Sequence, residues 1–235
     1  MYINTLIVRF KNKLYPSEIP LFRGAVIDAV GQEGHVLFHD HGETGFRYRY
    51  PLIQYKRIGG QAAIVCVGEG CEEMGALFSK GQFQLRLGDK RSEYFEVERV
   101  QPRRTMMKVW DDGFDYYLRN WLPLNSENYR KYQHTDAMTD KLQLLEQVLV
   151  GNILSACKGV GEHVEGEIRC KILHIEDPRK TYYKKVPWMS FDVVFRSNVS
   201  LPDYVGLGKG VSVGHGVVAR KRKSNNESNN DNTQD

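Results

Sequence analysis

Residues 46–67, FRYRYPLIQYKRIGGQAAIVCV, predict the strand hairpin around which the fold is organised. The stretches 46–56 and 61–67 are rich in β-branched and aromatic residues, and the pair Gly59-Gly60 lies between them. A glycine pair supplies the positive φ angles that tight hairpin turns require. We therefore predict two antiparallel strands at residues 46–56 and 61–67.

The sequence on either side of this hairpin completes the pattern of one domain. Residues 2–10 predict a first strand, and residues 21–30 carry apolar side chains at helical spacing. After the hairpin, residues 71–79 predict a short helix and residues 82–87 a further strand. The resulting order, β-α-β-β-α-β, is that of a ferredoxin-like domain.

The second half of the chain repeats this order of elements. Its best helix spans residues 137–158, where apolar side chains recur every three or four positions. A long segment, residues 111–135, separates this helix from the strand before it. The predicted strands of this half are residues 105–110, 165–175, 188–196 and 211–222.

Together these elements predict an α+β fold of two tandem ferredoxin-like (RRM-like) βαββαβ domains. We place the domains at residues 1–101 and 105–223. Residues 224–235 contain no apolar side chain, and such a segment cannot bury enough surface to offset its ordering entropy. A disordered tail is therefore expected there.

Composition limits the class of protein. With 41% hydrophobic and 26% charged residues in 235, the chain can bury a core, and no apolar run is long enough to span a membrane. The N-terminus lacks the features of a secretory signal, and the four cysteines form no C-x-x-C pair, so we expect reduced thiols and no zinc site. These features predict a cytoplasmic protein without a membrane partner.

Positive charge is modest overall but clustered. The formal net charge is +4, and basic residues gather at residues 47–57, 103–108, 179–185 and 220–223. Such clusters could follow a phosphate backbone, or they could simply coat a solvated surface. The charge pattern alone leaves both interpretations open.

A glycine-dense stretch, residues 206–216, has the sequence GLGKGVSVGHG. It does not fit a Walker loop, because Lys209 is followed by Gly210, and it does not fit the dinucleotide fingerprint, because position 211 is Val. Two interpretations remain from the residues: a loop whose amides and Lys209 contact phosphates, or a loop packed tightly against a neighbouring domain.

Three histidines lie close together in residues 35–41, HVLFHDH. In a strand His39 and His41 would project to the same side, and in a helix His35 and His39 would share a face. Paired imidazoles suit general acid–base chemistry, because their ordinary pKa lies near ~6.5. The H-x-H spacing also suits a metal ion, and surface or structural histidines remain a third interpretation.

Residues 201–218, LPDYVGLGKGVSVGHGVV, resemble the glycine-rich loop near the C-terminus of CRISPR-associated repeat-RNA endoribonucleases of the RAMP superfamily. Proteins of this family have duplicated ferredoxin-like domains, and the resemblance extends from residue 1 to about residue 222. The pair His39 and His41 is similar to the histidine pair of the archaeal-type branch. One departure is His215, where family members more often carry an aromatic residue.

The resemblance implies a metal-independent endoribonuclease without a cofactor that cuts CRISPR repeat RNA by 2′-hydroxyl attack, leaving a 2′,3′-cyclic phosphate. It implies catalytic roles for His41 and His39, with Tyr48 orienting or replacing one of them, and it makes Lys56 and Arg57 weaker candidates for a cation near the phosphate. Other CRISPR-associated proteins and a homodimer are further partners that it leaves open. The implied RNA-binding residues are Gly206, Gly208, Lys209, Gly210, Ser212, Gly214, Gly216, Arg220 and Lys221.

Three alternatives compete with this hypothesis. A catalytically silent RAMP-type subunit would bind RNA without cutting it. A histidine-metal hydrolase using His35, His39 and His41 would lose activity with a chelator. A purely structural two-domain protein would not bind repeat RNA at all.

Overall fold

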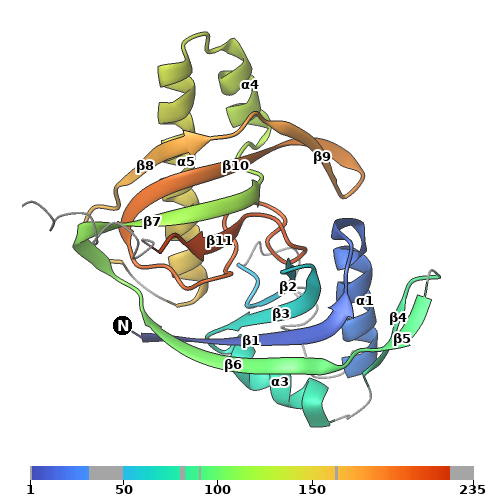
Figure 1. The fold of residues 1–235 in the computed structure, drawn as a ribbon. Helices are drawn as coiled ribbons and strands as arrows, with labels where there is room; N and C mark the ends of the chain where they lie inside the picture. The colour runs from blue at the N-terminus through green and yellow to red at the C-terminus, as the bar shows by residue number, and fades with distance from the viewer. Residues whose placement is uncertain (1, 32–49, 80–82, 90, 162–163, 223–235) are drawn as a thin grey trace, which may run out of the picture.

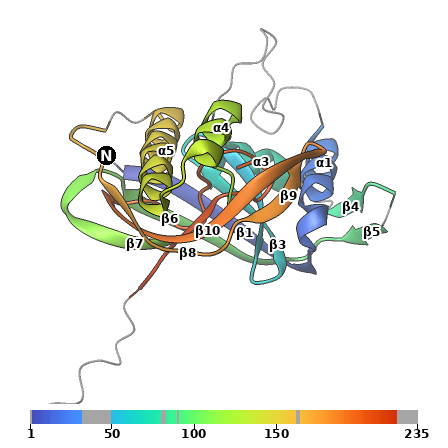
Figure 2. The same ribbon diagram turned by 90° about the horizontal axis from the view of Figure 1, so that it is seen from above.

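The structure, a computed structural model, describes residues 2–31, 50–79, 83–89, 91–161 and 164–222. These residues form two large antiparallel sheets, one from each half of the chain, and a small two-stranded sheet (Figure 1). Figure 2 shows α1, α4 and α5 on the same side of the strands. The helices of the described ranges include none that is both long and apolar enough to cross a membrane.

The first sheet has the strand order β2-β3-β1-β6, in which every neighbouring pair is antiparallel. This is the ferredoxin-like order that the sequence predicts. The predicted hairpin is present around Gly59 and Gly60, and both predicted helices are present. The elements are β1 (Tyr2–Lys13), a 3₁₀ turn η1 (Pro16–Glu18), α1 (Ile19–Val30), β2 (Ile53–Ile58), β3 (Gln61–Val67), α3 (Gly70–Ser79), β4 (Gln84–Leu87), β5 (Arg91–Tyr94) and β6 (Val97–Met106).

The strand predicted at residues 82–87 is confirmed as β4, from residue 84, but its predicted place as the fourth strand of the main sheet was wrong. Here β4 pairs with β5 in a separate two-stranded hairpin, and β6 is the strand that pairs with β1. Strand β6 carries Arg99, Pro102 and Arg103, so it lacks the apolar alternation typical of a strand. It lies at the edge of the sheet, where a proline costs no hydrogen bond within the ladder.

Aromatic residues form the centre of the first core. Phe22 of α1 stacks on Phe95, with ring centroids 5.2 Å apart, and meets Phe10 of β1 edge-on at 5.8 Å. All three rings are fully buried. The apolar face predicted for the first helix thus packs on the sheet, as its helical spacing requires.

The second sheet has the order β11-β7-β10-β8, and β9 pairs with the first part of β10. Strands β7, β8, β10 and β11 correspond to β1, β2, β3 and β6 of the first domain. With this correspondence the two sheets have the same strand order. Residues 200–216, between β10 and β11, contain no helix, so this domain has no counterpart of α3. The elements are β7 (Val109–Trp121), α4 (Ser126–His134), α5 (Met138–Gly159), β8 (Cys170–Ile175), β9 (Arg179–Tyr183), β10 (Val186–Val199) and β11 (Val217–Arg220).

Helix α5 confirms the predicted periodic helix, with Leu145, Leu149 and Ile153 buried against the sheet. The predicted connection at residues 111–135 was wrong, because β7 runs through its first part and α4 occupies much of the rest. Strand β7 pairs with β10 on one side and with β11 on the other. This pairing overrides the turn signal of the residues Asp-Asp-Gly at 111–113.

The element ends differ from the prediction at several places. The predicted strand at 211–222 is reduced to β11, and the strand at 165–175 begins only at Cys170. Strand β6 continues to Met106, past the domain end expected at residue 101, and β7 begins at Val109. Residues 224–235, the expected tail, lie outside the described residues.

Candidate nucleic-acid interface

The glycine-rich loop, residues 206–216, lies between the edges of the two sheets (Figure 1). On one side Gly206 forms an antiparallel bridge with Val217 of β11. On the other side the Tyr55 N–H of β2 donates to the Ser212 carbonyl at 3.0 Å, and Tyr55 bridges to Val213. The loop therefore satisfies backbone groups at the edges of both sheets and joins the two domains.

Glycine is required in this loop because the backbone is closely covered. Gly216 has a φ of +62°, and a Cβ there would lie 1.8 Å from the Leu207 carbonyl oxygen. A Cβ on Gly214 would lie 2.7 Å from Cδ1 of Ile19, on α1 of the first domain. Of the two interpretations that the residues left open, the structure thus supports tight packing against a neighbouring domain.

Two side chains of the first domain fix Gly206. The Tyr50 hydroxyl donates to its carbonyl at 2.9 Å, and its N–H donates to Oε1 of Gln54 at 3.0 Å. Burial raises the pKa of the Tyr50 hydroxyl, so it remains a neutral donor. Because the amide of Gly206 is used within the protein, it has no N–H left for a phosphate.

Lys56 is fully buried at the same contact. Its ammonium donates to the Val211 carbonyl of the glycine-rich loop at 3.0 Å, and burial lowers the pKa of Lys56 to about 7. The second cation candidate, Arg57, is exposed on the same strand and donates from Nε to the Leu14 carbonyl at 2.7 Å. Lys56 therefore holds the two domains together in the described structure.

His215 is buried within the loop, and its ring meets Tyr183 edge-on with centroids 5.7 Å apart. Burial lowers the pKa of His215, the positive charge of Lys56 lowers it further, and a hydrogen bond with the Asn120 backbone opposes both. The imidazole is thus packed like an aromatic ring. This accounts for a histidine at a position where the resemblance leads us to expect an aromatic residue.

The other predicted RNA-binding residues fall into two groups. Lys209 is half-buried, and its ammonium lies 4.9 Å from the ring centroid of Trp188 on β10. Arg220 and Lys221 are exposed at the far end of β11, against the rings of Phe114 and Tyr117. The structure buries Gly206, Gly210 and Gly216, and leaves Gly208, Ser212 and Gly214 partly accessible.

The predicted catalytic residues His39, His41 and Tyr48, together with His35, lie outside the described residues. Within the described residues no three His, Cys, Asp or Glu side chains gather as metal ligands do. The geometry of the acid–base pair therefore remains a prediction.

The sequence analysis missed the two side chains that anchor Gly206. Tyr50 and Gly206 are 156 positions apart, and Gln54 and Gly206 are 152 positions apart. No local pattern reports contacts of this kind. The glycine density itself was the available signal, since it indicates close backbone approach without naming the partner.

The two sheets, with the glycine-rich loop joining their edges, define a protein of two tandem ferredoxin-like domains. The Cas6b N-terminal domain matches residues 1–105, and the Cas6b C-terminal domain matches residues 108–221. The chain therefore belongs to the Cas6b family. This confirms the resemblance to CRISPR-associated repeat-RNA endoribonucleases, while the similarity of the His39 and His41 pair stays a prediction.

Two solved structures agree with this assignment, and one further relative is similar to part of the chain. A crystal structure of Cas6b aligns with a TM-score of 0.84 at 25% identity, over 94% of this chain and 100% of that chain. The structure of a CRISPR RNA processing endoribonuclease Cas6b aligns with a TM-score of 0.71 at 26% identity, over the same shares of 94% and 100%. The uncharacterized protein MJ0978 of Methanocaldococcus jannaschii is 38% identical over 104 residues, 44% of this chain and 69% of that protein.

Proposed function

We propose that this Cas6b-family protein is an endoribonuclease that processes CRISPR repeat RNA. Support comes from the family matches to both halves of the chain and from the similar solved structure of a CRISPR RNA processing endoribonuclease. The clustered basic residues around the second sheet suit a polyanionic substrate.

The reaction that we infer needs no metal. An RNA 2′-hydroxyl attacks the adjacent phosphorus, the 5′-oxygen leaves, and the products carry a 2′,3′-cyclic phosphate and a 5′-hydroxyl. The nucleophile is already tethered beside the phosphate, so the protein has to remove one proton, supply another and orient the groups. We assign the proton transfers to His39 and His41, with Tyr48 orienting one of them.

One observation carries this assignment. The segment with His39, His41 and Tyr48 ends at Tyr50, and the Tyr50 hydroxyl donates to the glycine-rich loop at 2.9 Å. The candidate acid–base residues thus precede, in the chain, the point at which the first domain meets the loop of the second. Lys209 is half-buried on that loop, and its ammonium could bind a phosphate of RNA held there.

The test uses a synthetic CRISPR repeat RNA in the presence of EDTA. We expect the wild-type chain to cut at one position and the double variant His39→Ala/His41→Ala to lose detectable cutting while its RNA affinity stays within a few-fold. His174→Ala, which changes an exposed histidine on β8, is the matched control and should cut normally. A 2′-deoxy substitution at the cut site should also stop the reaction.

Three results would contradict the proposal. Normal cutting by the double variant would remove the histidines from the mechanism. Cutting that stops with EDTA and returns with a divalent ion would favour a histidine-metal hydrolase. Repeat RNA that the wild-type chain binds but does not cut would favour a catalytically silent subunit.

A further inference from the structure

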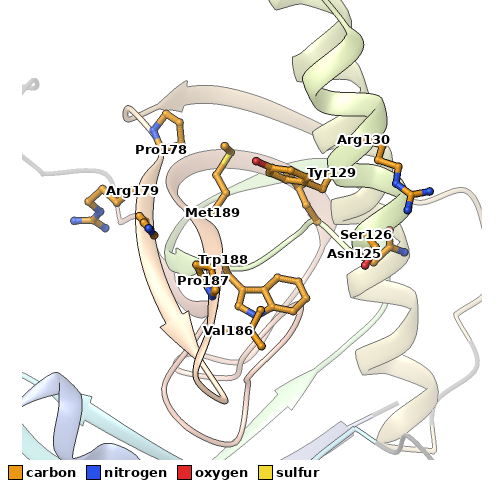
Figure 3. Close-up of a pocket in the computed structure, with 12 residues that line it drawn as sticks. Asn125, Ser126, Tyr129, Arg130, Pro178, Arg179, Val186, Pro187, Trp188 and Met189 are labelled. Carbon is orange, nitrogen blue, oxygen red and sulfur yellow. The ribbon is translucent and has the colours of Figure 1, made fainter.

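A pocket of about 830 Å³ lies between helix α4 and the hairpin of β9 and β10 (Figure 3). Neither element takes part in the acid–base step proposed above. Helix α4 lies in the long segment between β7 and α5, which has no counterpart in the first domain. The pocket is therefore a feature of the second domain that the proposed reaction leaves unexplained.

Aromatic side chains form the interior of the pocket. Figure 3 shows Tyr129 from α4 and Trp188 from β10 pointing toward its middle, with Met189 beside them. Tyr129 is 44% exposed, which is high for so large a side chain on a packed helix. The indole N–H of Trp188 is covered from solvent and has no acceptor within the described residues.

The charged side chains that line the pocket are all basic. Its lining includes Arg130, Arg179 and Lys180 and no aspartate or glutamate. Arg130 and Arg179 lie at opposite sides of the opening in Figure 3. The nearby carboxylate of Asp192 accepts from Arg179 at 2.7 Å and is itself largely buried. The surroundings thus favour an anionic ligand with a flat apolar part.

Trp188 also connects the pocket to the glycine-rich loop. The ammonium of Lys209 lies 4.9 Å from the Trp188 ring centroid. Lys209 is one of the residues that we expect to contact RNA phosphates. A strand of RNA held at Lys209 would therefore have its next bases at the edge of the pocket.

We propose that this pocket binds an unpaired nucleobase of RNA, stacked between Tyr129 and Trp188, with the flanking phosphates at Lys209 and Arg130. Every nucleobase has a π face that can stack on an aromatic ring. Proteins commonly bind single-stranded nucleic acid with aromatic side chains and flanking cations. The inference rests on the proposed function, since it takes RNA to be the substrate. It adds a binding site for single-stranded nucleotides that is built from residues other than the proposed acid–base residues.

The test measures binding of a short fluorescent oligouridylate to the full chain by anisotropy. Tyr129→Ala should weaken binding about 5- to 100-fold, the loss expected when one stacked base is removed. Tyr129→Phe keeps the ring and should bind nearly as the wild type does. Tyr94→Ala changes an exposed tyrosine on β5 that does not line the pocket, and it should have no effect.

A second measurement does not depend on any variant. Photo-crosslinking with oligouridylate containing 4-thiouridine, followed by peptide mapping, should mark residues 126–130 or 186–189. Crosslinks confined to other peptides would overturn the proposal. So would equal binding by the wild type and Tyr129→Ala, or no binding of oligouridylate by the wild type.

The outcomes also separate this inference from the proposed function. Normal cutting of repeat RNA together with Tyr129-independent binding would overturn the pocket and leave the nuclease assignment in place. Tyr129-dependent binding without any cutting would support the pocket and contradict the nuclease. If Tyr129→Ala instead turns a dimer into a monomer and leaves RNA affinity unchanged, the pocket is a contact between two copies and the inference fails.

Discussion

The two sheets of this protein have the same strand order, yet the chain completes them differently. In the first domain, helix α3 and the β4–β5 hairpin lie between β3 and β6, the third and fourth strands of the main sheet along the chain. In the second domain, residues 200–216 take that place without a helix. An extended segment exposes backbone groups that a helix would keep for itself. The connection in the second domain, which contains no helix, can therefore pair with the backbone of the first domain.

The cores show the same asymmetry. The buried residues of the first core all belong to its own domain, and Val213 of the glycine-rich loop packs against them. The second core includes Ile3 of β1 and Val67 of β3, which belong to the first sheet. The second domain thus depends on the first for part of its apolar packing, and the two should unfold together.

The largest loss of stability is expected from a substitution at Gly216. A Cβ there would overlap the Leu207 carbonyl oxygen, at 1.8 Å, so Gly216→Ala should destabilise the fold by roughly 4 kcal/mol or prevent folding. Gly161→Ala is the matched control, because Gly161 also has a positive φ, +78°, but has no atom near its Cβ position. It should cost only about 1 kcal/mol. Equal losses in urea unfolding would contradict the close packing of the loop.

The next largest effect is expected at Lys56, where it is a change in the stability of the protein with pH. Its pKa in the folded state is lowered to about 7 from an ordinary value of 10.5, so the unfolded chain binds more protons between these pH values. Stability should therefore rise with pH across this window. From pH 7 to about pH 9 the wild type should gain about 1–3 kcal/mol relative to Lys56→Met.

The difference between these two proteins isolates Lys56 from the thiols and tyrosines that titrate at higher pH. Lys158→Met, which changes an exposed lysine of α5, is the control. The difference in stability between the wild type and Lys158→Met should not change with pH across this window. Parallel stability curves for the wild type and Lys56→Met would mean that the Lys56 amine is not desolvated.

A smaller effect is expected at the ion pair between the two domains. Arg103 of β6 meets Asp203, next to the glycine-rich loop, at 2.9 Å, with both side chains partly exposed. Arg103→Ala should cost about 0.5–1 kcal/mol at low salt, and less at about 1 M salt because the pair is screened. A loss that does not change with salt would show that the charge pair contributes little to joining the domains.

The smallest effects should have the opposite sign. Gly24 in α1 and Gly151 in α5 have open space where a Cβ would lie. Replacing either by alanine should stabilise the protein by about 0.5–1 kcal/mol, because alanine loses less backbone entropy in a helix. Thermal unfolding of the two variants compares the two domains directly. A stabilisation in one domain alone would mean that the domains do not unfold as a unit.

Local sequence signals predicted the elements whose neighbours are close in the chain. The hairpin depends on the turn residues Gly59-Gly60, and helix α5 depends on the spacing of its apolar residues. Both signals lie within a few neighbouring positions of the sequence. The motif at residues 201–218 carried the family resemblance for the same reason. The proposed pair His39 and His41 was also found locally, and it is still to be tested.

Other features could not be predicted in this way. Strands β6 and β7 have polar or turn-like sequences and are strands because of their pairing with distant partners. The pocket of Tyr129 and Trp188 joins side chains from a helix and a hairpin that are remote in the chain.

The sequence by itself determined the family and the two repeated units with their shared β-α-β-β order, because these follow from short patterns of residue type. Only the tertiary structure decided that the glycine-rich loop joins two sheet edges and that Lys56 is buried beneath it. Burial and dielectric environment depend on contacts between segments more than a hundred positions apart, and a single residue type does not encode them.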